Sequence, residues 1–261
     1  MFDSLLRALR KDPPRRPAPT RPALLRTEHL EIETPAGLVP VALRRDRRAR
    51  NYTLRVKGAV ATPTLTMPFH GSLREARNFL DRHAGWLLRQ LEKAPLPRPI
   101  ADGETIPFRG APHRIRHSGA SRGTVAAIRE GEDCVLTVAG AEAHHRRRIF
   151  DFLKWEARRD LEAAVFRHAA TLGVTVKSVR IRDTSSRWGS CTSTGNLSFS
   201  FRLVMAPAFV LDYLAAHEVA HLREMNHSPR FWRVVEGLCP DYERARAWLL
   251  AYGPGLHAIG A

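Results

Sequence analysis

Cysteine is scarce in this sequence. The 261 residues include three, Cys134, Cys191 and Cys239, and no two of them form a CxxC pair. An odd number of widely spaced cysteines is not the pattern of a secreted domain held together by disulfides. Without a CxxC pair, a structural zinc site built from cysteines also has little support. We therefore expect reduced thiols.

Long apolar runs are missing as well. No stretch approaches the roughly 20 apolar residues that span a bilayer, and the apolar stretch 5–9 is too short and interrupted for a signal peptide. Repeats of solenoid length are also absent. We expect a globular protein of the cytoplasm with no membrane partner.

Acidic residues are outnumbered by basic ones. The chain has 42 Lys and Arg against 26 Asp and Glu, so its net charge is +16. Such a charge favours a polyanionic partner, nucleic acid above all, because binding releases counterions. The alternative is a solubilising surface, since the basic residues are spread along the chain. Charge alone leaves both interpretations open.

Composition changes along the chain and divides it into three parts. Residues 1–23 contain the proline and arginine mixture DPPRRPAPTRP, which cannot pack a core, so we expect a disordered lead-in. Residues 24–140 alternate short apolar stretches with glycine and proline, which predicts a strand-rich region with one helix over 73–93. We place a domain boundary near Gly140.

The third part, residues 141–261, has longer periodic segments. A helical pattern covers about 143–172, and two strands are expected over 174–181 and 196–203. Helices resume at Pro207, because proline is tolerated in a first turn. The predicted fold class is therefore α+β.

One short motif in this third part carries the chemistry. Residues 217–221 spell His-Glu-Val-Ala-His within an apolar helical stretch. Positions i and i+4 share a helix face, so His217 and His221 can present ring nitrogens to one ion at about 2.0–2.1 Å. Glu218 lies beside them, where it can take a proton from a water at the metal. The motif predicts a zinc site with Glu218 as general base.

A catalytic zinc site needs a third protein ligand and a fourth, open position. Glu224 follows on the same helical face, but at 1.5 Å per residue it lies about 10 Å along the axis from His217. His227 comes where the Asn-His-Ser-Pro stretch at 226–229 breaks the helix, so the chain can turn back and present it. We expect His227 as the third ligand, with Glu243 on a later helix as the alternative.

Several motifs in the second half of the chain occur together. They are SRWGSC at 186–191, LVMAP at 203–207, Tyr213, HEVAH at 217–221 and NHSPRFW at 226–232. Together they resemble the YgjP-like metallopeptidase family, which is similar to the SprT-like and WLM proteases among the zincins. The resemblance covers about Ala143 to Tyr252, and the Asp102-Gly103-Glu104 region also resembles longer family members.

This resemblance implies a zinc peptidase fold with a backing helix, a small sheet and a metal helix. It also implies His217, His221 and His227 as ligands. The spacing from His221 to His227 equals that of metzincins, but Glu224 replaces their glycine and no methionine turn is evident, which argues against that clan.

Other residues have weaker claims to a role. Trp188 lies in a tight turn that could line the cleft or simply pack, and Cys191 beside it is a poor candidate for a nucleophile. Tyr213, one turn before His217, could donate to a developing oxyanion or support the site from the core. The pair His144-His145 is interpreted as a solvated helix start. Ser198 is a candidate for substrate binding, because we expect substrate to extend along strand 196–203.

The function predicted from these residues is a zinc-dependent metallohydrolase of the peptidase type, with one Zn²⁺ per chain and a peptide or protein substrate. Two alternatives remain open. One is a nucleic-acid-associated protein, or a protease recruited to nucleic acid through its basic surface. The other is a metal-dependent hydrolase of nucleotide phosphoanhydrides, which the positive charge would also suit.

Overall fold

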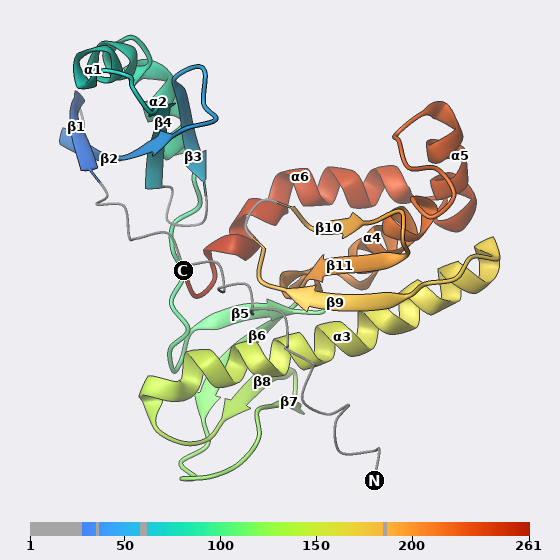
Figure 1. Cartoon of the computed structure of the whole chain (residues 1–261). Helices are drawn as coiled ribbons and strands as arrows, with labels where there is room; N and C mark the ends of the chain where they lie inside the picture. The colour runs from blue at the N-terminus through green and yellow to red at the C-terminus, as the bar shows by residue number, and fades with distance from the viewer. Residues whose placement is uncertain (1–27, 35–36, 58–61, 185–186) are drawn as a thin grey trace, which may run out of the picture.

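The computed structural model describes residues 28–34, 37–57, 62–184 and 187–261. The expected lead-in, residues 1–23, lies outside these ranges. Helices and strands follow one another in separate runs along the described chain, and the α+β class is confirmed (Figure 1). None of the helices in these ranges is long and apolar enough to cross a bilayer.

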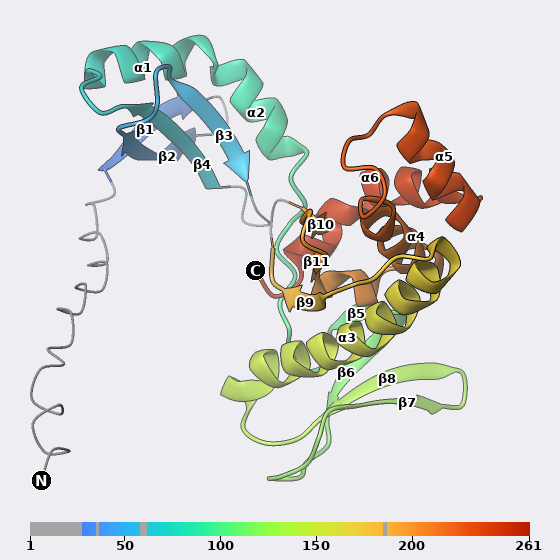
Figure 2. The ribbon, with the colours of Figure 1, turned by 45° about the vertical axis from the view of Figure 1, so that its right-hand side comes forward.

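The first unit is a four-stranded sheet covered by two helices (Figure 2). Its elements are β1 (Glu28–Thr34), β2 (Gly37–Asp46), β3 (Thr53–Lys57), β4 (Thr62–Pro68), α1 (Leu73–Arg82) and α2 (Ala84–Glu92). Apolar side chains from the strands and both helices form one core, among them Val41, Leu65 and Leu87. The prediction of one helix over 73–93 is wrong in detail, because the helical backbone is interrupted at His83 (φ −108°, ψ 9°).

A second four-stranded sheet follows. Its strands are β5 (Thr105–Phe108), β6 (Ala111–His117), β7 (Ala126–Glu130) and β8 (Asp133–Val138). The strand order β5-β6-β8-β7 matches the order β1-β2-β4-β3 of the first sheet. In both sheets a parallel central pair is flanked by antiparallel pairs. The two sheets therefore share one topology.

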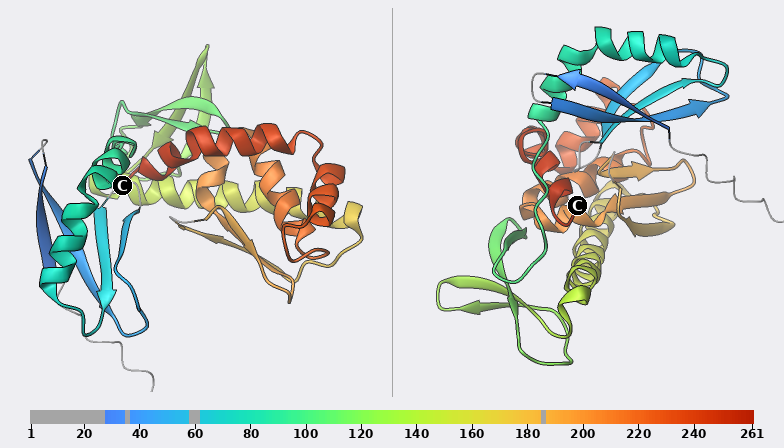
Figure 3. Two further views of the ribbon diagram at one scale, coloured as in Figure 1. Left: turned by 90° about the horizontal axis from the view of Figure 1, so that it is seen from above. Right: turned by 90° about the vertical axis from the view of Figure 1, so that its left-hand side faces the viewer.

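A long helix separates this second sheet from a third one. After the short helix η1 (Glu142–His144), α3 (His145–Leu172) ends at Gly173, whose φ of 66° suits glycine at a helix C-terminus. The three-stranded sheet consists of β9 (Ser178–Arg182), β10 (Gly189–Cys191) and β11 (Asn196–Ser200). Figure 3 shows α3 running beneath these strands.

The remaining elements are helical. They are η2 (Phe201–Met205), α4 (Ala208–Ala220), α5 (Pro229–Leu238) and α6 (Tyr242–Ala258). The strand expected over 196–203 ends early, because the chain turns into η2 after Ser200, whose hydroxyl accepts a hydrogen bond from Arg202 N (3.4 Å). η2 then leads directly into α4.

The hydrophobic cores divide at a different place from the boundary expected near Gly140. One core contains side chains from Ile106 on β5 to Ile259 at the end of the chain, and the other ends with α2. Arg98 already pairs with the carboxyl-terminal segment, since Arg98 N donates to Ala258 O (2.9 Å) and Gly260 N donates to Arg98 O (2.7 Å). The second sheet therefore packs with the carboxyl-terminal helices.

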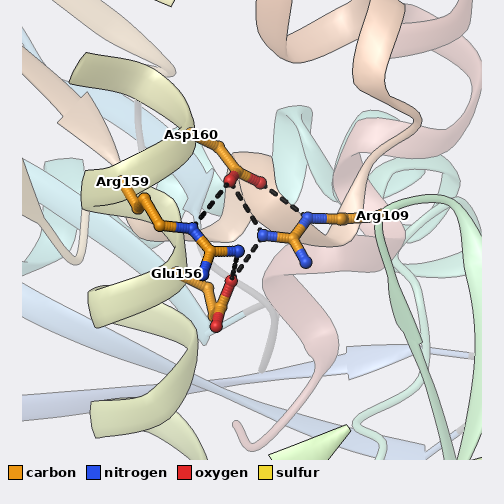
Figure 4. A network of polar contacts seen from close by, with 4 residues as sticks. All are labelled: Arg109, Glu156, Arg159 and Asp160. Carbon is orange, nitrogen blue, oxygen red and sulfur yellow. Dashed lines mark hydrogen bonds and ion pairs between the residues drawn. The ribbon is translucent and has the colours of Figure 1, made fainter. Parts of the chain in front are cut away.

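An ion-pair network fastens the β5–β6 turn to α3 (Figure 4). Arg109 binds both oxygens of Asp160 (2.7 and 2.8 Å) and also contacts the buried Glu156, which Arg159 binds at 2.7 Å. The backbone N–H of Arg109 donates to Val204 O (2.8 Å). Through this turn α3 is connected to η2, the segment that precedes α4.

The start of α3 differs from the expectation of two solvated histidines. His144 is exposed, but His145 is buried and its Nε2 lies 2.9 Å from Gly140 O. The side chain therefore supports the turn between β8 and α3.

Candidate metal centre and cleft

Helix α4 carries the His-Glu-Val-Ala-His motif and lies in the interior. Nearly every side chain from Val210 to Ala220 is buried, which is the pattern of a helix enclosed on all sides. Pro207 precedes its first turn, as expected. His217 and Glu218 belong to α4, and His221 caps its carboxyl end. Both histidines are thus held on a rigid element.

The structure brings the three predicted histidines together. One ring nitrogen from each of His217, His221 and His227 lies within 4.8 Å of the others. The Nε2 atoms of His217 and His227 are 3.2 Å apart. Two nitrogens bound to zinc at about 2.05 Å in tetrahedral geometry would lie roughly 3.3 Å apart. The donor set therefore fits a tetrahedral zinc ion.

His227 is presented by the turn between α4 and α5. Asn226 Oδ1 accepts from Ser228 N (3.2 Å), and Ser228 caps α5 by accepting from Phe231 N (3.4 Å). Pro229 occupies the first turn of α5. Hydrogen bonds to the residues before and after His227 thus hold this loop in place, as does the start of α5.

The two carboxylates considered as third ligands are not part of this group. Glu243 is exposed in the first turn of α6, and the Glu224 side chain does not join the cluster among the described residues. Glu224 instead contributes its backbone carbonyl, which lies 3.1 Å from His221 Nδ1. A proton on Nδ1 leaves Nε2 of His221 free for a metal.

Tyr213 supports His217 in the same manner. Its hydroxyl lies 3.4 Å from His217 Nδ1, and the residue is only 5% exposed. Burial raises the pKa of Tyr213 to about 12, so the phenol stays protonated. Of the two roles considered for Tyr213, the geometry favours support of the metal histidine.

Burial keeps two of the three histidines, His217 and His221, in their neutral form. Burial, together with His221 and His227, lowers the pKa of His217 to about 3, and burial also lowers the pKa of His221. Phe231, which is fully buried, stacks against His221 with ring centroids 4.5 Å apart. A neutral imidazole is the form that binds metal.

Glu218 is buried beside these rings. It is 4% exposed, and no hydrogen-bond partner for its Oε2 is found among the described residues. Burial raises the pKa of Glu218 to about 8, and the charge of Arg187 acts in the opposite direction. An unpaired carboxyl oxygen in an enclosed site is available for a substrate or a water.

A cleft of about 280 Å³ opens at this site, between β10 and α6. Trp188 and Tyr213 are among the residues that line it. The ring of Trp188 stacks on His257 of α6 at 4.4 Å. The opposite wall is Arg246, Leu249 and Leu250 of α6. These three residues could not be predicted from the sequence, because no motif marks them and only the fold brings α6 to the cleft.

The strand at the edge of the three-stranded sheet beside the cleft is β10, and not the expected strand over 196–203. The order β10-β11-β9 places β11 in the centre, so its backbone is paired on both sides. The prediction that substrate pairs with strand 196–203 is therefore wrong, and β10 is the strand that borders the cleft. Ser198 lies on β11 and lines a separate cavity on the outer face of the sheet.

Cys191 on β10 is a poor nucleophile. Burial and the nearby Glu218 raise the pKa of its thiol to about 11, and its Sγ contacts Thr192 O at 3.3 Å. A thiol with such a pKa is almost fully protonated near neutral pH.

Comparison with known proteins places this site in a family. The YgjP-like metallopeptidase domain model matches residues 50–252. The chain belongs to the YgjP-like metallopeptidase family. This family membership indicates a metal-dependent hydrolase whose substrates are peptides or proteins.

Other comparisons add little. No curated protein matches the chain. Among solved structures, the chain is similar to the crystal structure of the metallopeptidase zymogen of Pyrococcus abyssi abylysin, with 23% identity and a TM-score of 0.33. That match covers 35% of this chain and 92% of the other.

Proposed function

We propose that this YgjP-like protein is a zinc peptidase that holds one zinc per chain with His217, His221 and His227. The observation that supports this most strongly is the convergence of three histidine ring nitrogens within 4.8 Å, beside a buried carboxyl. In this proposal α3 is the backing helix, β9 to β11 the small sheet and α4 the metal helix of a zincin-like domain. That domain includes the second sheet and so extends from about residue 98 to 261.

Zinc, when bound, would polarise a carbonyl group and make water a better nucleophile. The residues of the chain supply the other parts of the chemistry. Glu218 acts as general base, because its Oε2 has no competing partner among the described residues and its carboxyl is enclosed. Burial raises the pKa of Glu218 to about 8, and the positive charge of a bound ion would lower it again and favour the ionised carboxylate, which is the form that accepts a proton.

The substrate would be held by β10. Trp188 O accepts from Ser200 N (2.8 Å), and Thr192 N donates to Asn196 O (3.1 Å). Backbone groups alternate in direction along an antiparallel pair, so those of Gly189 and Cys191 point away from β11, on the outer edge of β10. An extended peptide pairing with these groups would pass beside Glu218.

The experiment that tests this proposal is a digestion of a defined peptide mixture, followed by mass spectrometry. We expect cleavage by the zinc-loaded protein, loss of cleavage after chelation and recovery when zinc is restored. Nucleoside triphosphates serve as the competing substrate class. Zinc-dependent release of phosphate from them, without peptide cleavage, would replace this proposal with phosphoanhydride hydrolysis.

A further inference from the structure

A second cavity lies on the outer face of the three-stranded sheet, the face turned away from α3 and α4. Its volume is about 400 Å³. We call it the arginine pocket, after three of its lining residues, Arg180, Arg182 and Arg187. Most of its other lining residues carry hydroxyl or amide side chains, among them Ser190 and Ser198. No carboxylate is among its described lining residues.

Asp183 adjoins Arg182 of the pocket in sequence, but its carboxylate is bound to another arginine. Asp183 binds Arg202 (3.0 Å), whose guanidinium also donates to Leu256 O and Ile259 O (2.8 Å each). Within the described ranges, Arg180 and Arg182 have no ion pair, and both side chains are exposed. A concave site with several arginines and hydroxyl donors suits an anion.

A row of paired residues extends across the sheet from the pocket to β10, the strand that borders the cleft. Ser190 on β10 pairs with Ser198 on β11, which pairs with Arg180 on β9. Side chains in register across a sheet lie on the same face. This row of donors therefore leads from the interior of the pocket to the β10 edge.

We infer that the arginine pocket binds acidic side chains of the peptide substrate. The inference rests on the proposed function, because it requires a peptide paired with β10. Side chains of such a peptide alternate between the two faces of the sheet. One set lies on the face of Gly189, towards Glu218, and the other set lies on the face of Ser190, next to the pocket.

This arrangement predicts a particular pattern of specificity. Aspartate or glutamate should be preferred at every second residue of the bound substrate segment, and not at the residues between them. A surface attraction produced only by the net charge of +16 would show no such alternation. Acidic peptide is favoured over nucleic acid as the occupant, because the pocket borders the strand on which a peptide is expected to lie.

The test measures binding separately from cleavage. Two fluorescent decapeptide libraries differ only in that Asp and Glu in one are replaced by Asn and Gln in the other. Binding to zinc-loaded Glu218→Gln protein is followed by fluorescence anisotropy in about 0.15 M salt, where the Debye length of roughly 8 Å screens distant charges. We expect the acidic library to bind about tenfold more tightly, since a hydrogen bond between charged groups contributes at least that factor.

Variants locate the effect. Arg180→Gln with Arg182→Gln, in the same Glu218→Gln background, should abolish the preference for the acidic library. The matched control is Arg74→Gln with Arg77→Gln, which removes the same charge from exposed positions on α1. Equal loss of binding in the two double variants would overturn the inference, because it would show attraction by net charge alone.

Cleavage profiles of the wild type complete the test. Acidic residues enriched at alternate positions around the cleaved bonds support the pocket, whereas cleavage without this pattern contradicts it and leaves the zinc peptidase proposal standing. Conversely, arginine-dependent binding of acidic peptides without any zinc-dependent cleavage would support the pocket and reject the peptidase. Inorganic phosphate and single-stranded DNA are the competing ligands. If either binds more tightly than the acidic library, and if this binding is lost in the Arg180→Gln, Arg182→Gln protein, the pocket is a phosphate site and the inference is overturned.

Discussion

Gly189 and Glu218 are in contact across the cleft, and the space between them has no room for a side chain. A Cβ atom at residue 189 would lie 2.4 Å from Glu218 Oε1 and 2.8 Å from its Cγ and Cδ. Glu218 is enclosed, so its side chain has little freedom to move away. The glycine thus lets the β10 edge approach the general base closely.

We predict that Gly189→Ala displaces the Glu218 carboxylate and lowers peptide hydrolysis by at least about 10²-fold, because positioned proton transfer contributes roughly that much. Zinc content should stay at the wild-type level, since the ligands are untouched. Gly237→Ala on α5 is the control, because a Cβ there meets no atom within 4 Å. Wild-type turnover in the Gly189→Ala protein would show that the contact has no catalytic consequence.

The assignment of the third ligand is tested by His227→Ala. Loss of one of three protein ligands should leave the purified protein with substantially less than one zinc per chain. Glu243→Ala, which alters the exposed alternative on α6, should retain full zinc. The measurement is elemental analysis of both variants. The reverse result would transfer the third ligand to Glu243.

The contact between Tyr213 and His217 predicts an effect on metal affinity. Removing a group that orients a metal ligand typically costs 10- to 100-fold in affinity, and the long 3.4 Å contact places Tyr213→Phe near the lower limit, at about tenfold. Competition with a chromogenic chelator measures this change. Tyr252→Phe, at an exposed position of α6, is the matched control. Equal zinc affinities in the two variants would show that Tyr213 does not orient His217.

Asp212 links the metal helix to the backing helix. Its Oδ1 accepts from His168 Nε2 (2.8 Å) and from Arg167, both on α3. Burial opposes ionisation of Asp212, but His168 and Arg167 outweigh it and lower the pKa of the carboxyl. A lowered pKa in the folded state means that the ionised form stabilises the fold above the pKa of the unfolded chain.

We therefore predict that Asp212→Asn lowers the free energy of unfolding by about 1 kcal/mol near pH 7, a modest value because the pair is partly exposed. The difference from wild type should persist down to about pH 5 and shrink as the pH falls below the unfolded value of about 3.9. Urea unfolding at a series of pH values measures it. A difference that grows on acidification would contradict the sign of this linkage.

The metal site was predictable because its ligands are close in sequence. His217, Glu218 and His221 lie within five residues of one helix, where local periodicity alone fixes which side chains share a face. The stretch 226–229 gave an equally local signal for His227, because its Asn, Ser and Pro residues predict a break in the helix. The structure brings these residues together as the sequence predicted, while their binding of zinc remains a proposal.

The surroundings of the site were not predictable in the same way. The position of β10 at the sheet edge depends on which strands pair with one another, and a local periodic pattern does not determine that pairing. β10 also has only three residues, which is too short for a pattern to be recognised. The approach of α6 to the cleft is likewise a long-range contact. The boundary expected near Gly140 followed a change of local pattern, but packing of β5 to β8 against α3 determines the core.

We propose Glu218 as the base beside a zinc ion held by three histidines. The most direct measurement compares zinc content and peptide turnover of wild type and Glu218→Gln on a substrate found by digestion screening. We predict about one zinc per chain in both proteins and a turnover at least roughly 10²-fold lower in the variant, because the amide cannot accept a proton. Turnover near the wild-type level in zinc-loaded Glu218→Gln protein would show that Glu218 is not the base.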